Sequence, residues 1–170
     1  MRETRYLSQR SEFGLLFLSI EFCEVSWHFQ RQKHLLCKTP LELLRQFLAG
    51  RSVIACDGPK IIGHVTIWPL LDNWGEGGSL WVRSEYRGRG LARELMRRLI
   101  KIHADENVLY TTTNEIVKTV CRDVGLRETG FFELPEKIHR ATCTCSVKKM
   151  GTNGYLDCRL KDVECKLFVN

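Results

Sequence analysis

Arginine and glycine alternate in one short segment of the chain, Arg87-Gly88-Arg89-Gly90, which lies directly before a helix-forming stretch. The first turn of a helix presents backbone N–H groups that have no partner inside the helix, and the helix dipole adds partial positive charge there. The two arginines add full charges, and the two glycines let a ligand approach the backbone because they carry no Cβ. The segment therefore predicts a turn that binds a phosphate group.

Three familiar patterns for binding phosphates or nucleic acids do not fit this segment. The dinucleotide fingerprint G-x-G-x-x-G requires a third small residue at position 93, where the chain has Arg93. The P-loop requires Gly-Lys-Ser/Thr at its end, and the chain has no such residues there. Arginine–glycine tracts that bind RNA are repetitive and disordered, whereas this segment occurs once and is followed by an apolar helical stripe.

The spacing Arg87-x-x-Gly90-x-Ala92 resembles the R/Q-x-x-G-x-G/A signature of the GNAT superfamily of N-acetyltransferases, which binds the pyrophosphate of acetyl-coenzyme A (acetyl-CoA). Neighbouring segments resemble that family in the same order: an L-x-V strand, the signature, a long helix, a short strand and a helix that opens with Asn114. The resemblance covers roughly positions 50 to 145. It implies acetyl-CoA as the cosubstrate, bound by Leu80, Trp81, Val82, Arg87, Gly88, Arg89, Gly90, Leu91, Ala92, Arg93 and Asn114.

Acetyl transfer to an amine requires a base that takes the proton of the amine, and the departing thiolate benefits from an acid. Short GNAT enzymes that resemble N-acetylglutamate synthase carry an acidic-x-x-S-L-x-V run, which begins here at Glu76, the first candidate for the base. A solvated loop glutamate is the alternative, and His64 is a second candidate base. The family usually places a tyrosine seven residues after the helix-opening Asn as the acid, and this chain has Cys121 there. A thiol could donate a proton; the alternative is a small buried side chain with water as the donor.

The resemblance implies an acetyl-CoA-dependent N-acetyltransferase in which the acceptor amine attacks the thioester directly. The stretch Leu134-Pro135-Glu136-Lys137 is similar to the closing part of the glutamate-acetylating subgroup. A small metabolite amine, with amino acids as one class, is therefore the leading acceptor. The alternatives are a protein N-acetyltransferase, a catalytically weak or silent GNAT domain that senses CoA or binds a partner, and a nucleic-acid-binding zinc module. A homodimer stays open as well.

Composition restricts the partners and the compartment. The chain has 170 residues, enough for one domain with its own core, and a net charge of +6, which favours anionic partners such as coenzyme A. Nucleic acid ranks lower because the chain shows no recognised nucleic-acid motif and no interleaving of aromatic and basic residues. The longest apolar run near the start, residues 13–20, is far too short to span a bilayer. We therefore expect a cytoplasmic protein without a membrane partner.

Helical and strand patterns alternate along the chain and predict an α/β fold, a central mixed sheet flanked by helices. A first helix is expected within residues 11–36, with an apolar stripe at roughly helical spacing through Phe13, Phe17, Ile20 and Trp27. A capping box at residues 39–42 begins a second helix, which Gly50 ends. Before these helices only Tyr6-Leu7 could form a strand. The other predicted elements are strands 52–56 and 60–68 joined by a turn at Asp57-Gly58, a loop 69–78, a strand 79–83, a helix 91–103, a strand 108–112, a helix 114–123 and closing strands 131–134 and 138–143.

Four cysteines lie close together near the C-terminus, namely Cys143, Cys145, Cys158 and Cys165. They could bind zinc, although zinc sites usually show two C-x₂₋₄-C pairs and this set does not. Disulfides and reduced thiols are the competing interpretations. The sequence thus predicts a GNAT domain over residues 1–145 and a small cysteine-containing extension over 146–170, packed on the same domain.

Overall fold

The computed structural model of the protein describes residues 4–8, 14–31, 38–142 and 164–170. The chain divides into two compact units. Met1–Ile67 and Gly78–Ile102 form the first unit, and Trp68–Gly77 and His103–Asn170 form the second unit. The strand β4 (Trp74–Val82) contributes to both, because it begins in the second unit and ends in the first. None of the described helices is long and apolar enough to cross a membrane.

The strands of the first unit follow one another in the order β1-β2-β3-β4. β1 (Arg5–Leu7) pairs antiparallel with β2 (Ser52–Asp57), and β2 pairs antiparallel with β3 (Lys60–Pro69). The predicted turn between β2 and β3 is confirmed, and Gly58 has the positive φ of 56° that glycine adopts easily. The short first strand that the sequence left uncertain is therefore present.

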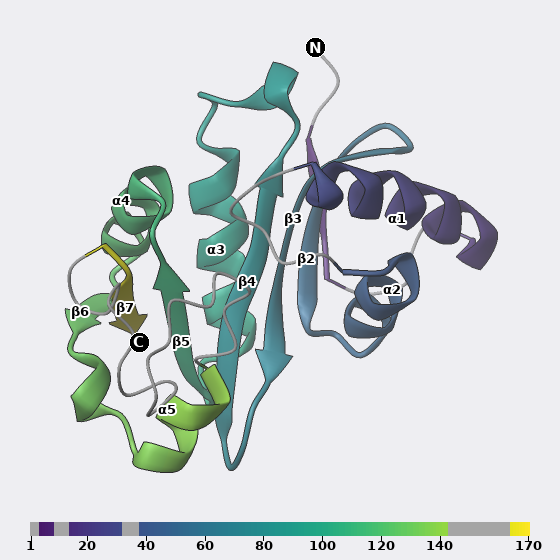
Figure 1. The fold of residues 1–170 in the computed structure, drawn as a ribbon. Coiled ribbons are helices and arrows are strands. Elements are labelled where there is room, and N and C mark those ends of the chain that lie inside the picture. Colours follow the sequence, from purple (N-terminus) through teal and green to yellow (C-terminus); the bar gives the residue numbers. More distant parts are fainter. Residues whose placement is uncertain (1–3, 9–13, 32–37, 143–163) are drawn as a thin grey trace. The chain divides into compact units, whose positions relative to one another are not determined.

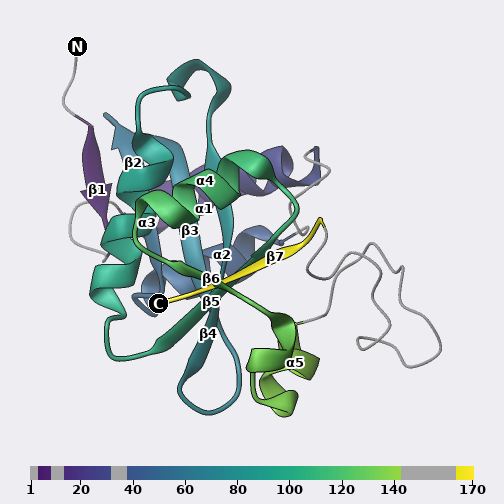
Figure 2. The same ribbon diagram turned by 90° about the vertical axis from the view of Figure 1, so that its left-hand side faces the viewer.

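Helices cover both faces of β3 in the first unit. A Cβ on Gly63 would lie 2.9 Å from Leu95 of α3 (Leu91–Ile102), whereas the ring of the next residue, His64, contacts Phe22 of α1 (Leu15–Gln30). Successive residues of a strand point to opposite faces. Accordingly, Figure 2 shows α3 in front of these strands and α1 behind them. This burial on both faces explains why residues 61–67 of β3 are all buried.

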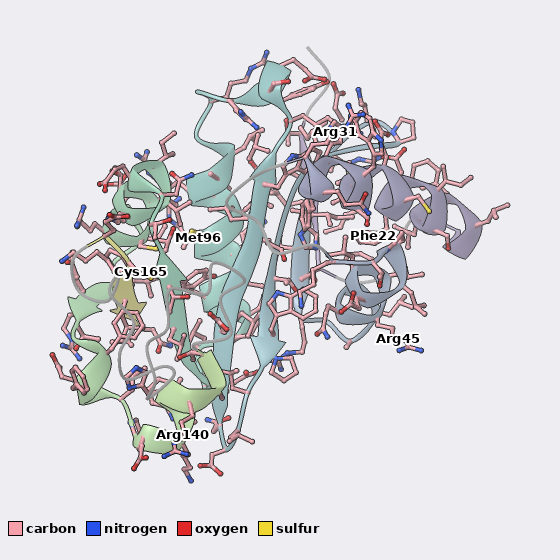
Figure 3. The ribbon with its side chains drawn as sticks, in the orientation of Figure 1. Phe22, Arg31, Arg45, Met96, Arg140 and Cys165 are labelled. Carbon is pink, nitrogen blue, oxygen red and sulfur yellow. The ribbon has the colours of Figure 1, made fainter. Side chains whose placement is uncertain are left out.

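The helix α1 packs against α2 (Pro40–Leu48) in the first unit (Figure 1). α2 begins with the predicted capping box: the Thr39 hydroxyl accepts from Glu42 N at 3.2 Å, and the Glu42 carboxylate accepts from Thr39 N at 2.8 Å. Figure 3 shows Phe22 between the two helices, where its ring centroid lies 5.8 Å from that of Phe47. The second helix therefore begins where the sequence predicted.

The buried face of α1 differs from the predicted apolar stripe. Ile20 and Trp27 belong to that predicted stripe, but they are 60% and 46% exposed. The helix carries two apolar stripes with the same spacing, so periodicity alone cannot select the buried one. The stripe that packs into the core consists of Leu18, Phe22, Val25 and Phe29.

The described part of the second unit contains the beginning of β4 and three further strands in the order β4-β5-β7-β6. β4 runs parallel to β5 (Asn107–Thr112), and β7 (Lys166–Val169) lies antiparallel between β5 and β6 (Arg127–Thr129). The helices α4 (Glu115–Asp123) and α5 (Glu136–Thr142) belong to the same unit (Figure 1). One cluster of its buried residues consists of Leu109, Phe131, Leu134, Ile138, Leu167 and Val169. The predicted mixed sheet with flanking helices is thereby confirmed.

Three predicted segments of the second unit have a different structure. Residues 131–134 and 138–143 were expected as strands, but Phe131–Glu133 is a short 3-10 helix and α5 follows it. Pro135 explains this, because its carbonyl accepts from the N–H groups of Ile138 and His139 and so starts a helix. The predicted loop 69–78 is shorter, since β4 already begins at Trp74. The domain boundary at 145 lies outside the described residues and stays a prediction.

Candidate functional site

The glycine–arginine turn, residues Arg87–Gly90, joins a short 3-10 helix (Ser84–Tyr86) to α3 in the first unit. Gly88 and Gly90 have φ angles of 74° and 79°, in the left-handed region that favours glycine. A Cβ built on either glycine would meet no atom within 4 Å. Both glycines are thus needed for their backbone conformation, and the space beside them is open to a ligand.

The arginines of this turn bond back to the chain. Arg87 donates from Nε to the carbonyl of Val82 at 3.0 Å, and Arg89 donates from Nη2 to the carbonyl of Glu85 at 2.9 Å. The Arg89 guanidinium also lies 5.1 Å from the ring centroid of Tyr86. A guanidinium has five N–H donors, so one bond to the backbone orients it and leaves others for an anion. Both arginines are exposed, as is Arg93 in the first turn of α3.

The beginning of α3 continues the same surface. The first backbone bond that closes a turn of this helix runs from Glu94 N to Gly90 O at 3.1 Å. The three preceding N–H groups, those of residues 91–93, have no acceptor inside the helix. A 12-residue helix that begins after a glycine turn presents the positive end of its dipole there, which attracts negative charge. The first unit therefore brings together the predicted phosphate-binding residues.

The strand before this turn contains a backbone irregularity. Ser79 has a φ of 54°, which is uncommon for a residue other than glycine, and its carbonyl lies 3.1 Å from Nδ1 of His64. The pairing of β4 with β5 runs from Trp74 to Gly77, so the irregularity follows the last paired residue. Burial lowers the pKa of His64 to about 4, so the imidazole is neutral at pH 7.

The predicted cofactor strand, Leu80-Trp81-Val82, follows Ser79 directly. Leu80 is half-buried and the other two side chains are buried. The Trp81 ring packs 5.0 Å from that of His28. The side chains of Trp81 and Val82 belong to the core of the first unit, so a contribution of these two residues to a ligand has to come from their backbone.

Arg83, which the sequence analysis missed, ties this strand to its neighbours. It is only 5% exposed, donates from Nε to the Ile61 carbonyl at 2.7 Å, and pairs with Glu24 of α1 at 2.7 Å. The hydrogen bond from Arg83 lowers the pKa of Glu24, whereas burial, followed by the charge of Arg83, lowers that of His28. No sequence signal separates this arginine from the exposed ones nearby, because its burial depends on a helix far away in sequence.

The predicted base, Glu76, lies in the second unit. It is half-buried in β4, not on a loop, and its Oε1 accepts a hydrogen bond from the Thr111 hydroxyl at 2.9 Å. The next residue, Gly77, pairs with Tyr110, and a Cβ there would overlap the Tyr110 ring. The Thr111 hydroxyl therefore orients the side chain of Glu76, in a part of the strand that packs tightly against Tyr110.

The predicted acid, Cys121, is buried in α4. Burial raises the pKa of its thiol to about 12, so the thiol is protonated at pH 7 but is a weaker proton donor than an exposed one. Tyr110 of β5, a tyrosine that could also act as the acid, is buried too, and burial raises the pKa of its phenol. Asn114 is the N-cap of α4, where its Oδ1 accepts from Ile116 N at 2.9 Å. The predicted acid and base thus lie in the second unit, and the predicted phosphate-binding turn lies in the first.

Of the four candidate zinc ligands, Cys143, Cys145 and Cys158 lie outside the described residues. Cys165 is half-buried and directly precedes β7. Within the described parts of the chain, no group of three or more His, Cys, Asp or Glu side chains could hold a metal ion. Zinc binding by the C-terminal cysteines therefore stays a prediction.

Comparisons with known proteins give the family. A family model described as Acetyltransferase (GNAT) family matches residues 20–122, more than half of the chain. A search of the curated proteins found no match.

Solved structures share the fold at low sequence identity. N-acetylglutamate synthase from Neisseria gonorrhoeae, complexed with coenzyme A and N-acetyl-glutamate, matches with a TM-score of 0.65 and 14% identity over 100% of this chain. This chain covers only 35% of that synthase. Rv2747 from Mycobacterium tuberculosis, solved with CoA, has the same TM-score and identity, with 97% of both chains covered. Diaminobutyrate acetyltransferase from Paenibacillus lautus, solved with its substrate and coenzyme A, matches with a TM-score of 0.59 and 15% identity, over 99% of this chain and 95% of that one.

The glycine–arginine turn, the strand before it and the helix after it all lie within the residues that the family model matches. The chain therefore belongs to the GNAT acetyltransferase family.

Proposed function

We propose that this protein transfers an acetyl group from acetyl-CoA to the amino group of a small metabolite, with amino acids as the leading class. The observation that carries the proposal is the glycine–arginine turn at the start of α3. Two of the similar structures contain small amino-acid ligands of their own, N-acetyl-glutamate and L-2,4-diaminobutyric acid. This supports the same acceptor class for a chain that shares their fold.

The described residues of the first unit fit the pyrophosphate of acetyl-CoA. The open space beside Gly88 and Gly90 leaves room for phosphate oxygens against the backbone. Arg87 and Arg89 would donate charge-assisted hydrogen bonds from nitrogens that the backbone carbonyls do not use. Binding here fixes one reactant, and holding two reactants in place supplies much of the rate enhancement of a transfer reaction.

The backbone of Leu80–Val82 would hold the pantetheine arm and donate to the acetyl carbonyl oxygen. That oxygen gains negative charge when the amine attacks the carbonyl carbon, so a fixed N–H donor stabilises the transition state more than the ground state. The left-handed Ser79 supports this role, because it interrupts the regular strand immediately before these residues.

We assign the removal of the amine proton to Glu76, acting directly or through a water molecule. The Thr111 hydroxyl fixes the carboxylate by donating to Oε1 at 2.9 Å. A second proton is needed by the departing CoA thiolate, and its source differs. A thiol reference pKa is about 8.5, so a Cys121 thiol with a pKa of about 12 would donate a proton to the departing thiolate against an unfavourable difference. This favours protonation by water, with Cys121 as a packed side chain.

A screen of amino acids and other small amines, followed by the release of free CoA thiol, tests this proposal. We expect at least one small amino acid to stimulate thiol release far above the rate without an acceptor. Mass spectrometry of the product should show one added acetyl group on the amine nitrogen. Thiol release that no small amine stimulates, together with acetylation of added peptides, would contradict the proposal and favour a protein N-acetyltransferase.

The burial of Cys121 also supports a second function, a GNAT domain that binds acetyl-CoA but catalyses weakly. Such a domain would sense CoA or bind a protein partner. It would bind acetyl-CoA in a thermal-shift assay and show only slow hydrolysis with every acceptor. Acceptor-dependent turnover would exclude it.

A further inference from the structure

We propose that His64 is a positioning residue of the acetyl-transfer site, which holds the left-handed Ser79 in β4 by donating from Nδ1 to its carbonyl. By fixing Ser79, His64 would set the direction of the Leu80–Val82 backbone that follows. This inference rests on the proposed function, in which that backbone holds the acetyl group. All of the residues involved belong to the first unit.

The conformation of Ser79 requires something to hold it. A left-handed φ is unfavourable for a residue with a Cβ. The two preceding residues, Gly77 and Gly78, could adopt such a φ without penalty, yet they do not have positive φ values. The strain falls on the one residue of this short run that has a side chain. Its carbonyl oxygen lies 3.1 Å from a fully buried imidazole nitrogen.

The hydrogen bond assigns the tautomer of His64. A carbonyl oxygen can only accept, so Nδ1 carries the proton and Nε2 of the neutral ring is an acceptor. Nε2 is buried and has no hydrogen-bond partner among the described residues. The ring is held instead by Phe22 and Phe29 of α1, whose centroids lie 5.9 and 5.8 Å away. Packing therefore sets the orientation of the ring, and its single hydrogen bond is directed at Ser79.

Stability does not account for a histidine at this position. A buried acceptor without a partner destabilises the folded state, and an apolar side chain would pack against the two phenylalanines without that penalty. Residues kept at the expense of stability are typical of sites that need a particular geometry. Here, the particular geometry is that of the Leu80–Val82 backbone, which follows Ser79 in β4.

Two substitutions separate the hydrogen bond from the packing. His64→Leu removes the donor and keeps an apolar side chain against the phenylalanines, whereas His64→Asn keeps an N–H donor near the position of Nδ1. Thr66→Val is the matched control, because Thr66 lies two residues after His64 in β3. The substitution removes a buried hydroxyl that bonds with Ser52 Oγ at 2.6 Å and donates to the Arg51 carbonyl at 2.9 Å.

For His64→Leu we expect the turnover number to fall about 10- to 100-fold, as small misplacements of a reacting group do. The affinity for CoA itself should change by less than about 3-fold, because the glycine–arginine turn is untouched, and the melting temperature should change by only a few degrees. The His64→Asn variant should recover most of the turnover. Thr66→Val should lower the melting temperature and leave turnover unchanged.

Amide hydrogen exchange provides a readout that does not depend on activity. Residues 79–82 should exchange faster in His64→Leu than in the wild type, and His64→Asn should restore their protection. Unchanged exchange in these residues, or a turnover loss that Asn does not rescue, would overturn the inference. If the wild type itself neither binds acetyl-CoA nor acetylates an amine, the proposed function fails instead, and the exchange experiment still decides whether His64 holds Ser79.

Discussion

In the first unit, the backbone conformation of the glycine–arginine turn alone leaves open space for a ligand. In the second unit, the properties of the candidate acid and base depend on the side chains around them. Gly88 and Gly90 take the conformation that only glycine adopts easily, and the space beside them is open. Glu76 and Cys121 are ordinary residue types whose roles depend on Thr111 and on burial. The proposed binding turn therefore depends on residues close together in the sequence, and the proposed acid–base chemistry depends on tertiary contacts.

The largest expected effect tests the second unit. Glu76→Gln keeps the size of the side chain and its contact with Thr111 but removes the carboxylate that would take the amine proton. The turnover number should fall about 10²- to 10⁴-fold, the usual contribution of a general base. Steady-state kinetics with the best acceptor measures it. The exposed Glu85→Gln is the control, and an equal loss there would remove Glu76 from the mechanism.

The next prediction concerns the first unit, where His64 should make the free energy of unfolding depend on pH. The pKa of His64 is about 4 in the folded protein against 6.5 in the reference, so the unfolded chain binds a proton first as the pH falls. Stability is therefore full above pH 6.5 and is lost as the pH falls toward 4, by on the order of 3 kcal/mol. Denaturant unfolding of the wild type and of His64→Asn between pH 7 and 4 measures this, and the loss should be smaller in the variant. An equal loss of stability in the wild type and in His64→Asn would show that His64 is not buried in its neutral form.

A smaller effect concerns packing around the candidate base. Gly77→Ala places a Cβ against the Tyr110 ring, which is fully buried and cannot move freely. We expect a loss of about 1–3 kcal/mol in the free energy of unfolding, as for other overpacked cores. Chemical denaturation measures it, with the exposed Thr119→Ala as the control. Unchanged stability would mean that the second unit is packed less tightly around β4 than described.

The smallest effect is expected for the buried Cys121 of α4. Cys121→Ala should change the turnover number by less than about 3-fold if water protonates the departing thiolate. A general acid usually contributes at least about 100-fold, so a loss of that size would make Cys121 the acid. Kinetics under conditions where chemistry limits the rate distinguishes the two. The melting temperature of the variant shows whether any loss reflects packing alone.

The sequence predicted features that depend on nearby residues, and it did not predict those that depend on distant ones. The capping box of α2, the turn at Gly58 and the glycine–arginine turn all depend on residues close together in the chain, and the structure confirms them. The strand β7 was missed because its partner β5 lies far away in sequence. The buried face of α1 differs from the predicted stripe because two equally spaced stripes compete.

The missed site residues have the same explanation. Arg83 is buried because Glu24 of α1 and the carbonyl of Ile61 accept its hydrogen bonds, and no local pattern signals that pairing. The His64–Ser79 contact joins two neighbouring strands across 15 residues. Spacing rules find turns that bind ligands, and they do not find side chains whose environment comes from another strand or helix.

The most direct test of the central claim is the affinity for acetyl-CoA measured by isothermal titration calorimetry. The wild type should bind it, and Arg87→Ala combined with Gly90→Glu should weaken binding by at least about 100-fold, because charge-assisted donors are removed and a carboxylate occupies the turn. Arg97→Ala, an exposed arginine of α3 that pairs with Glu94, should bind as the wild type does. Acetyl-pantetheine, which lacks the pyrophosphate, should not distinguish the double variant from the wild type. Equal affinity of both proteins for acetyl-CoA would contradict the account.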